Sequence, residues 1–415
     1  MHKSLGSDVR LREVWAWSMY DFANSGYTTV VITAVFSAYF VGVVAANAAW
    51  ATLAWTAALS ASYALVLATG PVIGAWADEH AAKKKLLLAS TAGCVLFTLL
   101  LAFAGPGAVA YSLALVILSN YFFGVGENLI AAFLPQLADS RAMGRVSGWG
   151  WSFGYLGGLV ALGICLFYIT ATANAHVPFT MVITAVFFAA AATPTFLFLR
   201  ERAVRQARIS AWTRLLQTFR ASEKYRDLRR FLLCLMFYQA GITTVISLAA
   251  IYADQAMKFT MQQTIVLILV VNVTAALGAF GFGYLQDALG HVRSVALTLA
   301  GWIAMVTIAG FSETKESFWV AANIAGLCMG ASQAAGRAIV GYLSPPARLA
   351  EFFGLWGLAV KAASIAGPLA YGITTWVFAG NHRLGIFATG LFFVAGLILL
   401  RGIDVERGRA AALAP

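Results

Sequence analysis

The chain has 415 residues, of which 61% are apolar and only 11% are charged, with a formal net charge of +11. Soluble domains carry about 25% charged residues, so this composition excludes a water-exposed globular surface and predicts a membrane-embedded protein. Apolar runs of about 20 residues cross a bilayer as helices, because unpaired backbone groups are costly in lipid. The first residues are polar, and we expect the first span to serve as the insertion signal without a cleaved signal peptide.

Twelve helical spans are predicted in two groups of six, which makes the fold class an all-α integral membrane protein. Residues 1–199 form the N-terminal half, 200–230 a basic linker and 231–415 the C-terminal half. The spans cover roughly 15–44, 52–77, 85–104, 108–134, 146–170, 177–199, 231–253, 262–286, 292–311, 317–343, 352–378 and 384–401.

The basic residues indicate how the chain is oriented in the membrane. Most of them lie in the linker, in the loops around Lys83–Lys85 and 139–145, and at Arg293 and Arg348. If these segments face the cytoplasm, both termini are cytoplasmic. The linker then lies where it can bind anionic lipid headgroups, and no aromatic stacking motif accompanies its charges, so no nucleic-acid partner is expected.

Cysteine and tryptophan residues carry no predicted chemistry. Cys94, Cys165, Cys234 and Cys328 lie in apolar runs without C-x-x-C spacing, which predicts core residues rather than disulfides or metal ligands. Trp15, Trp17, Trp50 and Trp55 fall near the ends of predicted spans, where a tryptophan belt is expected.

Two motifs recur at almost the same offset, which predicts a repeat of the six-helix half. The first motif recurs after 209 positions and the second after 210, and both copies lie in matching spans. A third pair, Tyr20-Asp21 and Tyr238-Gln239, is a weaker match. The recurring motifs are Gly74-x-x-x-Asp78 with Gly283-x-x-x-Asp287, and Gly126-Glu127 before Pro135 with Gly336-Arg337 before Pro345.

Four ionisable residues lie deep in the predicted spans: Asp21, Glu127, Arg337 and Lys361. A charge in the bilayer costs about 2.5–3.5 kcal/mol or more, so each needs a partner or a watery cavity. Glu127 and Arg337 occupy equivalent places in the two halves. They are predicted to face each other across a central cavity, either as a pair that opens on substrate or proton binding or as a static ion pair that fixes packing.

The other predicted site residues also leave alternatives open. Asp21 is interpreted as a proton site or as a cap for neighbouring helices, and Lys361 as a ligand for a substrate carboxylate or as the partner of an acid. Neutral polar side chains are expected to line the same path: Asn24, Asn128, Gln239 and Gln333.

The two Gly-x-x-x-Asp motifs end helices beside short basic loops. An aspartate there can accept hydrogen bonds from the N-terminus of a neighbouring helix, where the dipole favours an anion. Such a contact acts as a gate if it breaks during transport, and otherwise as a structural cap. The predicted gate residues are Gly74, Asp78, Gly283, Asp287 and Arg293. The glycines of span 5 (Gly148, Gly150, Gly154, Gly157 and Gly158) predict close packing or a sliding surface.

The chain resembles the major facilitator branch that is related to the fungal autophagy-linked vacuolar effluxers. The resemblance rests on Trp17–Ser25 with Tyr39-Phe40, Leu134-Pro135, Arg145–Gly148, Gly154–Gly158, Gln333 with Arg337, Glu351–Leu355, Lys361 and Gly367-Pro368. It implies a twelve-helix secondary transporter, places Glu351 with the gate residues, and for the fungal relatives implies efflux of amino acids from the vacuole. The first Gly-x-x-x-Asp loop departs from the pattern, because it lacks the second glycine that Gly290 supplies in the other half.

The expected protein is therefore a proton-coupled transporter that moves a small zwitterionic or anionic solute by alternating access. We expect a monomer in the bacterial inner (plasma) membrane that contacts lipids and carries no cofactor or metal. No nucleotide-binding loop or hydrolase motif is found, so no enzyme activity is expected. An exporter of lipophilic drugs, lipids or siderophore-like molecules is the alternative within transporters, and a membrane receptor or scaffold is the alternative outside them.

Overall fold

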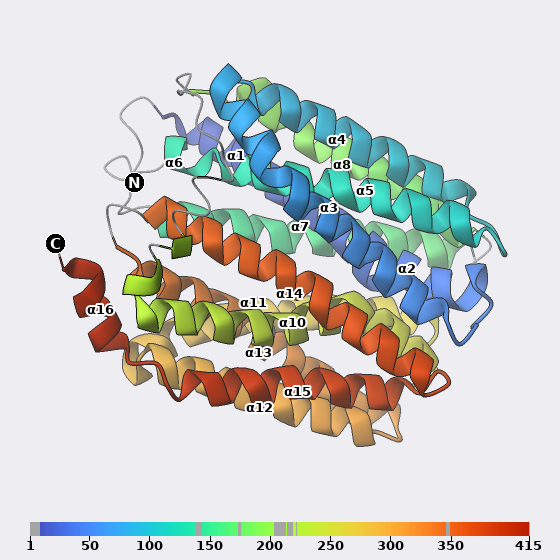
Figure 1. Ribbon diagram of the computed structural model, residues 1–415. Coiled ribbons are helices and arrows are strands. Elements are labelled where there is room, and N and C mark those ends of the chain that lie inside the picture. Colours follow the sequence, from blue (N-terminus) through green and yellow to red (C-terminus); the bar gives the residue numbers. More distant parts are fainter. Residues whose placement is uncertain are drawn as a thin grey trace. The chain divides into compact units, whose positions relative to one another are not determined.

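The computed structural model describes residues 9–137, 143–172, 176–202, 213, 219–220, 222–345 and 349–414. All regular structure within these ranges is helical (Figure 1). The chain forms two compact units. Unit 1 comprises Met1–Asn47 and Ala61–Ala211, and unit 2 comprises Ala48–Ser60 and Trp212–Pro415.

The first six long helical stretches follow the predicted spans closely. The first is a continuous run in which π-helical segments η2 (Thr28–Ala34) and η3 (Phe40–Val44) alternate with α1 (Leu11–Tyr27) and α2 (Phe36–Tyr39). The other five are α3 (Ala51–His80), α4 (Lys83–Leu100), α5 (Val109–Ala131), α7 (Met143–Ala171) and α8 (Thr180–Phe198). A short helix, α6 (Leu134–Leu137), lies between α5 and α7.

The later helices repeat this pattern and add a short C-terminal helix. They are α10 (Arg226–Gln255), α11 (Met261–Leu289), α12 (His291–Phe311), α13 (Lys315–Leu343), α14 (Leu349–Val377), α15 (His382–Leu400) and α16 (Val405–Leu413).

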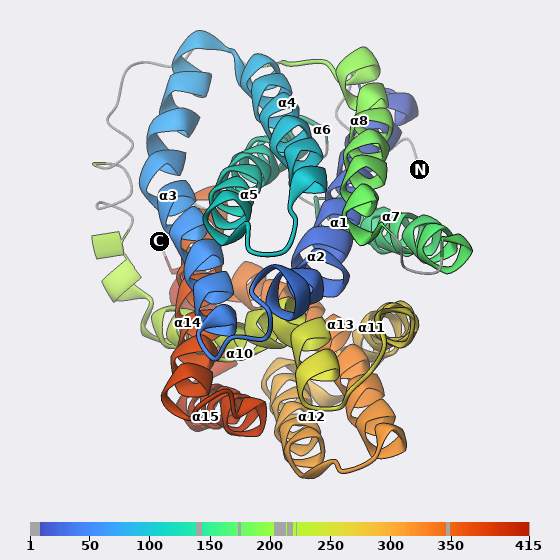
Figure 2. The ribbon, with the colours of Figure 1, turned by 90° about the vertical axis from the view of Figure 1, so that its right-hand side faces the viewer.

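The long helices of the two units pack in corresponding pairs (Figures 1 and 2). In unit 1, α1 packs against α7 and α8, and α4 packs against α5 and α8. In unit 2, α10 packs against α14 and α15, and α12 packs against α13 and α15. These contacts match between the units, whereas the extensive contact of α11 with α13 in unit 2 has no counterpart of similar extent between α3 and α5 among the described residues.

Eleven helices in the described ranges are long and apolar enough to cross a membrane. The remaining long helix, α13, corresponds to the tenth predicted span and carries Asn323, Gln333 and Arg337. These polar side chains lower its mean hydropathy. The protein is an all-helical membrane protein, while the count of exactly twelve spans and the cytoplasmic placement of both termini stay predictions.

Four glycines of α7, namely Gly150, Gly154, Gly157 and Gly158, lie directly against the first helical stretch. A Cβ atom at Gly154 would lie 2.8 Å from Ser25 Oγ, and one at Gly157 would collide with the backbone carbonyl of Phe22. In unit 2, a Cβ atom at Gly367 on α14 would collide with the carbonyl of Ala240 on α10. Close helix packing, the first of the two predicted roles, is therefore what these four glycines perform in this structure, while the surroundings of Gly148 lie outside the described part. All four cysteines are buried and free, as predicted.

Candidate functional site

The four ionisable residues of the predicted site lie on four different helices and are all half-buried. Asp21 is on α1 and Glu127 on α5, both in unit 1. Arg337 is on α13 and Lys361 on α14, both in unit 2. Among these four residues, unit 1 therefore carries the acids and unit 2 the bases. The predicted pairing of Glu127 with Arg337 stays a prediction.

Asp21 lies at the contact between α1 and α7. A Cβ atom at Gly150 would collide with Asp21 Oδ2 and lie 2.8 Å from the ring of Trp17. The Trp17 indole nitrogen donates to the carbonyl of Ile130 at 2.9 Å, which fixes this ring. Glycine at position 150 thus leaves the space that the carboxylate occupies, and a larger residue there would displace it.

Glu127 follows Gly126, which accommodates a buried tyrosine. A Cβ atom at Gly126 would lie 2.6 Å from Tyr20 Oη. The Tyr20 hydroxyl and the Thr91 hydroxyl are 2.8 Å apart and form a hydrogen bond. This contact joins α1, α4 and α5 one residue before Glu127, so the backbone that carries this acid is held by close packing.

Arg337 is positioned by an aromatic ring on the next helix. Its Cζ atom lies 5.4 Å from the centroid of the Trp356 ring on α14, within the range of a cation–π interaction. Lys361 follows Trp356 on the same helix. The residue before Arg337, Gly336, lies against the hydroxyl of Tyr238. Helices α13 and α14 thus carry the two candidate cations, and α10 contacts both of these helices.

The neutral polar residues differ in burial. Asn24 is buried, and its Oδ1 has no hydrogen-bond partner among the described residues. Asn128 is exposed, while Gln239 and Gln333 are half-buried. Asn128 also lines a pocket of about 90 Å³ with Gly70, Gly74 and Lys83. The pocket brings one predicted path residue and one predicted gate residue together at the same place in unit 1.

The predicted gate is only partly described. Gly74 and Asp78 lie on α3, Gly283 and Asp287 on α11, and Glu351 on α14. The side chains of Asp78, Asp287 and Glu351 and the surroundings of Gly283 lie outside the described part, so the gate contacts stay predictions. Arg293 is exposed near the beginning of α12.

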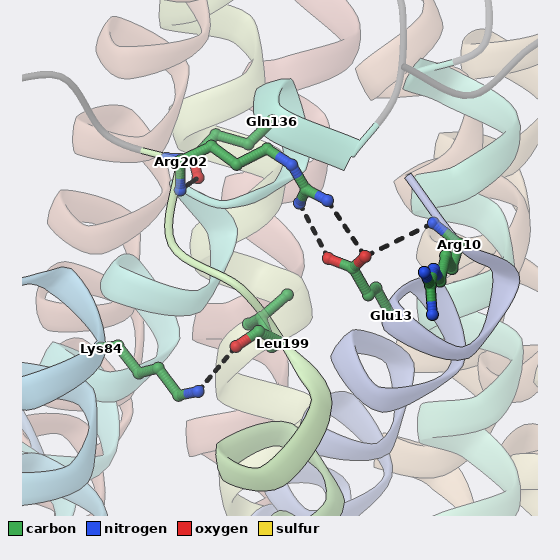
Figure 3. A network of polar contacts seen from close by, with 6 residues as sticks. All are labelled: Arg10, Glu13, Lys84, Gln136, Leu199 and Arg202. Atoms are coloured by element: carbon green, nitrogen blue, oxygen red, sulfur yellow. Dashed lines mark hydrogen bonds and ion pairs between the residues drawn. The ribbon is translucent and has the colours of Figure 1, made fainter. Parts of the chain in front are cut away.

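A polar cluster that the sequence analysis missed lies at one end of unit 1 (Figure 3). Arg202 donates to both oxygens of Glu13, at 2.8 and 3.0 Å, and the Glu13 side chain is only 2% exposed. The Arg202 backbone N–H donates to Gln136 Oε1 at 2.9 Å. The segment after α8 is thereby fastened to the beginning of α1 and to α6, which follows α5. We call Glu13, Gln136, Glu201 and Arg202 the N-terminal cluster.

The same segment also caps α4. The Glu201 carboxylate accepts from the backbone N–H groups of Lys83 and Lys84, at 2.7 and 3.2 Å. The Lys84 ammonium donates to the carbonyl of Leu199 at 2.7 Å (Figure 3). A carboxylate at a helix N-terminus satisfies unpaired N–H groups and complements the helix dipole.

Unit 2 contains a counterpart, the C-terminal cluster of Asp227, Asp404, Arg407 and Arg409. Arg407 donates to both oxygens of Asp227, at 2.8 and 2.6 Å, and this hydrogen bonding raises the pKa of the Arg407 guanidinium. Arg409 donates to the carbonyl of Tyr342 at 2.9 Å. The segment after α15 is thus fastened to the beginning of α10 and to the end of α13. In unit 2 these contacts reach α13, the helix that carries Arg337. In unit 1 they reach the short α6, which follows α5, the helix that carries Glu127.

Fold comparisons show which solved structures share this architecture. The structure matches that of the nucleoside transporter NupG with a TM-score of 0.70 and 13% identity, covering 96% of this chain and 99% of that one. It matches a bacterial homolog of the human lysosomal transporter Spinster with a TM-score of 0.71 and 11% identity, covering 98% of both chains. At this identity the likeness shows the fold alone. With its apolar helices, the chain has the fold of membrane transporters.

Sequence comparisons identify the family. The family described as "Vacuole effluxer Atg22 like" matches residues 37–413, so the chain belongs to this family. The chain is 27% identical over 408 residues to "Uncharacterized MFS-type transporter YxiO" of Bacillus subtilis (strain 168), and 94% of each chain is covered. It is 25% identical over 302 residues to "Autophagy-related protein 22-1" of Neosartorya fischeri, covering 65% of this chain and 49% of that protein. The chain thus spans about half the length of this fungal relative. It is a transporter of the major facilitator type, as predicted.

Proposed function

We propose that this protein is a proton-coupled secondary transporter of amino acids or similar small zwitterions and anions. One observation carries the proposal: the acids Asp21 and Glu127 lie on helices of unit 1, and the bases Arg337 and Lys361 lie on helices of unit 2. An ammonium group is the cation that the acids bind, and a carboxylate is the anion that the bases bind. The proposed solute therefore carries both groups.

Family membership supports the same substrate class. The family name describes vacuole effluxers, and the resemblance set out above implies amino-acid efflux for the fungal members. Function does not follow from fold alone, so the substrate class rests on the charges of the site. Alternating access is the mechanism that we propose for moving the solute.

Proton coupling follows from the chemistry of carboxylates in membranes. Carboxylic acids within membrane spans are typical of proton relays, so we infer that Asp21 or Glu127 binds and releases the proton during the cycle. We assign the proton to one of these two residues and make Arg337 the counter-ion. Asn24, Asn128, Gln239 and Gln333 supply neutral hydrogen-bonding groups to the path.

The proposal also includes the location of the protein and its partners. We place the protein in a bacterial inner membrane as a monomer surrounded by lipid, without a cofactor and without nucleic-acid partners. The second candidate, export of a lipophilic molecule, is favoured by aromatic side chains on the helix that carries Asp21, such as Phe22, which stacks on Phe187 with ring centroids 5.4 Å apart.

Uptake by proteoliposomes tests the proposal. Purified protein is reconstituted, and a labelled amino-acid mixture is supplied with and without an imposed pH gradient. We expect accumulation that requires the gradient and that Glu127→Gln and Arg337→Ala each reduce at least tenfold. Uptake of lipophilic cations in place of amino acids would favour the second candidate. Normal transport by both variants would overturn the site assignment but not the substrate class.

A further inference from the structure

Two tyrosines occupy equivalent places in the two units. Tyr20 on α1 and Tyr238 on α10 are each 1% exposed. The hydroxyl of Tyr20 lies against Gly126, and that of Tyr238 lies against Gly336. Each glycine immediately precedes a candidate charge of the site. The repeat has therefore kept the shape of this contact in both halves of the chain.

The chemistry of the contact differs between the units. In unit 1, the Tyr20 hydroxyl bonds to Thr91 at 2.8 Å, and Thr91 is in turn 2.8 Å from the carbonyl of Leu87. Ser90 contributes a second hydroxyl, 3.3 Å from where a Cβ atom of Gly126 would lie. Tyr20 thus belongs to a satisfied network that joins α1, α4 and α5.

Tyr238 has no such network. At offsets of 209 and 210 positions from Ser90 and Thr91, α12 reads Leu299-Ala300-Gly301, and the buried hydroxyl of Thr298 just before this stretch donates to the carbonyl of Val295 at 2.8 Å. Among the described residues, no group forms a hydrogen bond with Tyr238 Oη. A buried hydroxyl without a partner costs stability, because its hydrogen bonds to water are lost and not replaced. A phenylalanine would fill the same space without that cost, so the hydroxyl contributes nothing to the fold seen here.

The Tyr238 hydroxyl lies close in the chain to candidate binding residues. Tyr238 precedes Gln239 on α10, and Gly336 precedes Arg337 on α13, so the contact lies between helix positions adjacent to two candidate binding residues. Arg337 is held with its Cζ 5.4 Å from the Trp356 ring centroid. Because position 336 has no side chain, the Tyr238 hydroxyl lies directly against the backbone of α13, with the side chain of Leu235 on α10 close by.

We propose that Tyr238 is a solute-binding residue whose hydroxyl donates a hydrogen bond to the carboxylate of the transported solute. Arg337 supplies the positive charge at the same place in unit 2. The hydroxyl is buried in this structure and becomes accessible when α10 and α13 part at Gly336. This inference rests on the proposed function, because it assumes a solute that carries a carboxylate. Tyr20, whose hydroxyl is already paired, keeps a structural role only.

A matched pair of variants tests the inference. Tyr238→Phe and Tyr20→Phe remove the same atom from equivalent places, and each is measured for thermal unfolding and for uptake of labelled amino acids in proteoliposomes. We expect Tyr238→Phe to unfold at the wild-type temperature or above and to raise the KM for uptake tenfold or more. We expect Tyr20→Phe to unfold at a lower temperature and to keep the wild-type KM.

A competition arm identifies the group that Tyr238 contacts. Amines that correspond to the amino acids without their carboxylate are added as competitors. The wild type is expected to prefer the amino acid strongly over the amine, and Tyr238→Phe to lose much of that preference. An unchanged KM and preference in Tyr238→Phe, or a loss of stability as large as that of Tyr20→Phe, would overturn the inference alone. Absence of amino-acid uptake by the wild type would overturn the proposed substrate class together with it.

Discussion

Arg202 and Glu13 form a bidentate ion pair that joins the segment after α8 to the beginning of α1, across 189 positions of the chain. Arg407 and Asp227 form the same kind of pair between the segment after α15 and the beginning of α10. Each unit is thus fastened at the same structural place by an acid near the start of its first helix and an arginine after its last long helix.

The first prediction concerns the pair in unit 1. Glu13→Gln keeps the shape of the side chain but removes its charge, and we expect it to destabilise unit 1 by about 3 kcal/mol. That value is the low end for a broken buried pair, because the Arg202 side chain is 27% exposed and stays partly hydrated. The measurement is the thermal unfolding temperature in detergent.

Glu223→Gln is the matched control, because Glu223 pairs with Arg229 at 3.7 Å and both side chains are largely exposed. Exposed pairs contribute about 0–1 kcal/mol, so this variant should unfold close to the wild-type temperature. Equal effects of the two substitutions would show that burial of the Glu13 pair does not matter.

The second prediction concerns α16. This helix is held by Arg407 on Asp227 and by Arg409 on the carbonyl of Tyr342, and Gly408 lies against Leu343 at the end of α13. A chain that ends before Val405 loses these contacts and leaves the buried carboxylate of Asp227 without its arginine. We expect it to unfold at a lower temperature than the wild type.

Adding Asp227→Asn to the truncated chain separates the causes. If the unpaired carboxylate is the main penalty, the double change should recover part of the lost stability, because an amide is cheaper to bury than an unpaired charge. No recovery would assign the loss to the missing packing of α16.

The long helices were predictable from the sequence, because an apolar run of the right length has few alternatives in a membrane. The clusters were not predictable, since Glu13 and Arg202 are far apart in the chain and each resembles an ordinary charge at a helix end. One signal was present: an acid stands in the first turn of both α1 and α10. Together with the predicted repeat, the two acids indicate that each half contains a basic partner in an equivalent place. In the structure that partner is an arginine after the last long helix of each half.

The four tryptophans that the sequence places near the ends of spans differ in exposure. Trp15 and Trp50 are exposed, but Trp17 and Trp55 are buried. Trp15 and Trp17 are two positions apart, so a helix directs them to opposite faces. Proximity to a helix end predicts depth in the membrane but not which face a side chain occupies.

The candidate site was predicted only as a set of residue types on particular helices. The sequence placed Glu127 and Arg337 in matching spans, and the long helices carry all four charged residues as expected. It did not show that Gly150 makes room for Asp21, or that Trp356 lies beside Arg337. Such contacts depend on helix rotation and crossing, which hydropathy does not encode.

The third prediction uses the glycines of α7. A Cβ atom at Gly157 would collide with the backbone of Phe22, whereas one at Gly163 on the same helix would meet nothing within 4 Å. Gly157→Ala should therefore force α1 and α7 apart and cost about 1–3 kcal/mol. Gly163→Ala should be neutral or slightly stabilising, because alanine favours helix by up to about 1 kcal/mol over glycine.

Both variants are compared by thermal unfolding and by yield of folded protein. A loss of stability in Gly163→Ala as large as in Gly157→Ala would mean that the contact between α1 and α7 is not the cause.

The fourth prediction concerns the turns that the two Gly-x-x-x-Asp motifs lead into. Between α11 and α12, Gly290 has a φ of +83° in open space, a conformation that glycine adopts without strain. At the corresponding position after α3, Ala81 has a φ of +49°, and the next backbone N–H, that of Ala82, bonds to the carbonyl of Ala77 at 3.0 Å. This is the Schellman ending of a helix, in which glycine is the preferred residue. The departure of the first loop from the family pattern thus places an alanine in a left-handed conformation.

Exchange of the two residue types should therefore have opposite effects. A left-handed conformation such as that of Ala81 costs a residue with a Cβ atom about 1–2 kcal/mol, and the conformation of Gly290, with ψ 163°, is essentially restricted to glycine. Against this, glycine loses about 0.4–1 kcal/mol more than alanine in chain entropy on folding. Ala81→Gly should thus stabilise the protein by about 0.5 kcal/mol, and Gly290→Ala should destabilise it by at least as much. Thermal unfolding of both variants checks the signs. A loss of stability in Ala81→Gly would show that the alanine is accommodated without strain, and that the missing glycine does not weaken the first loop.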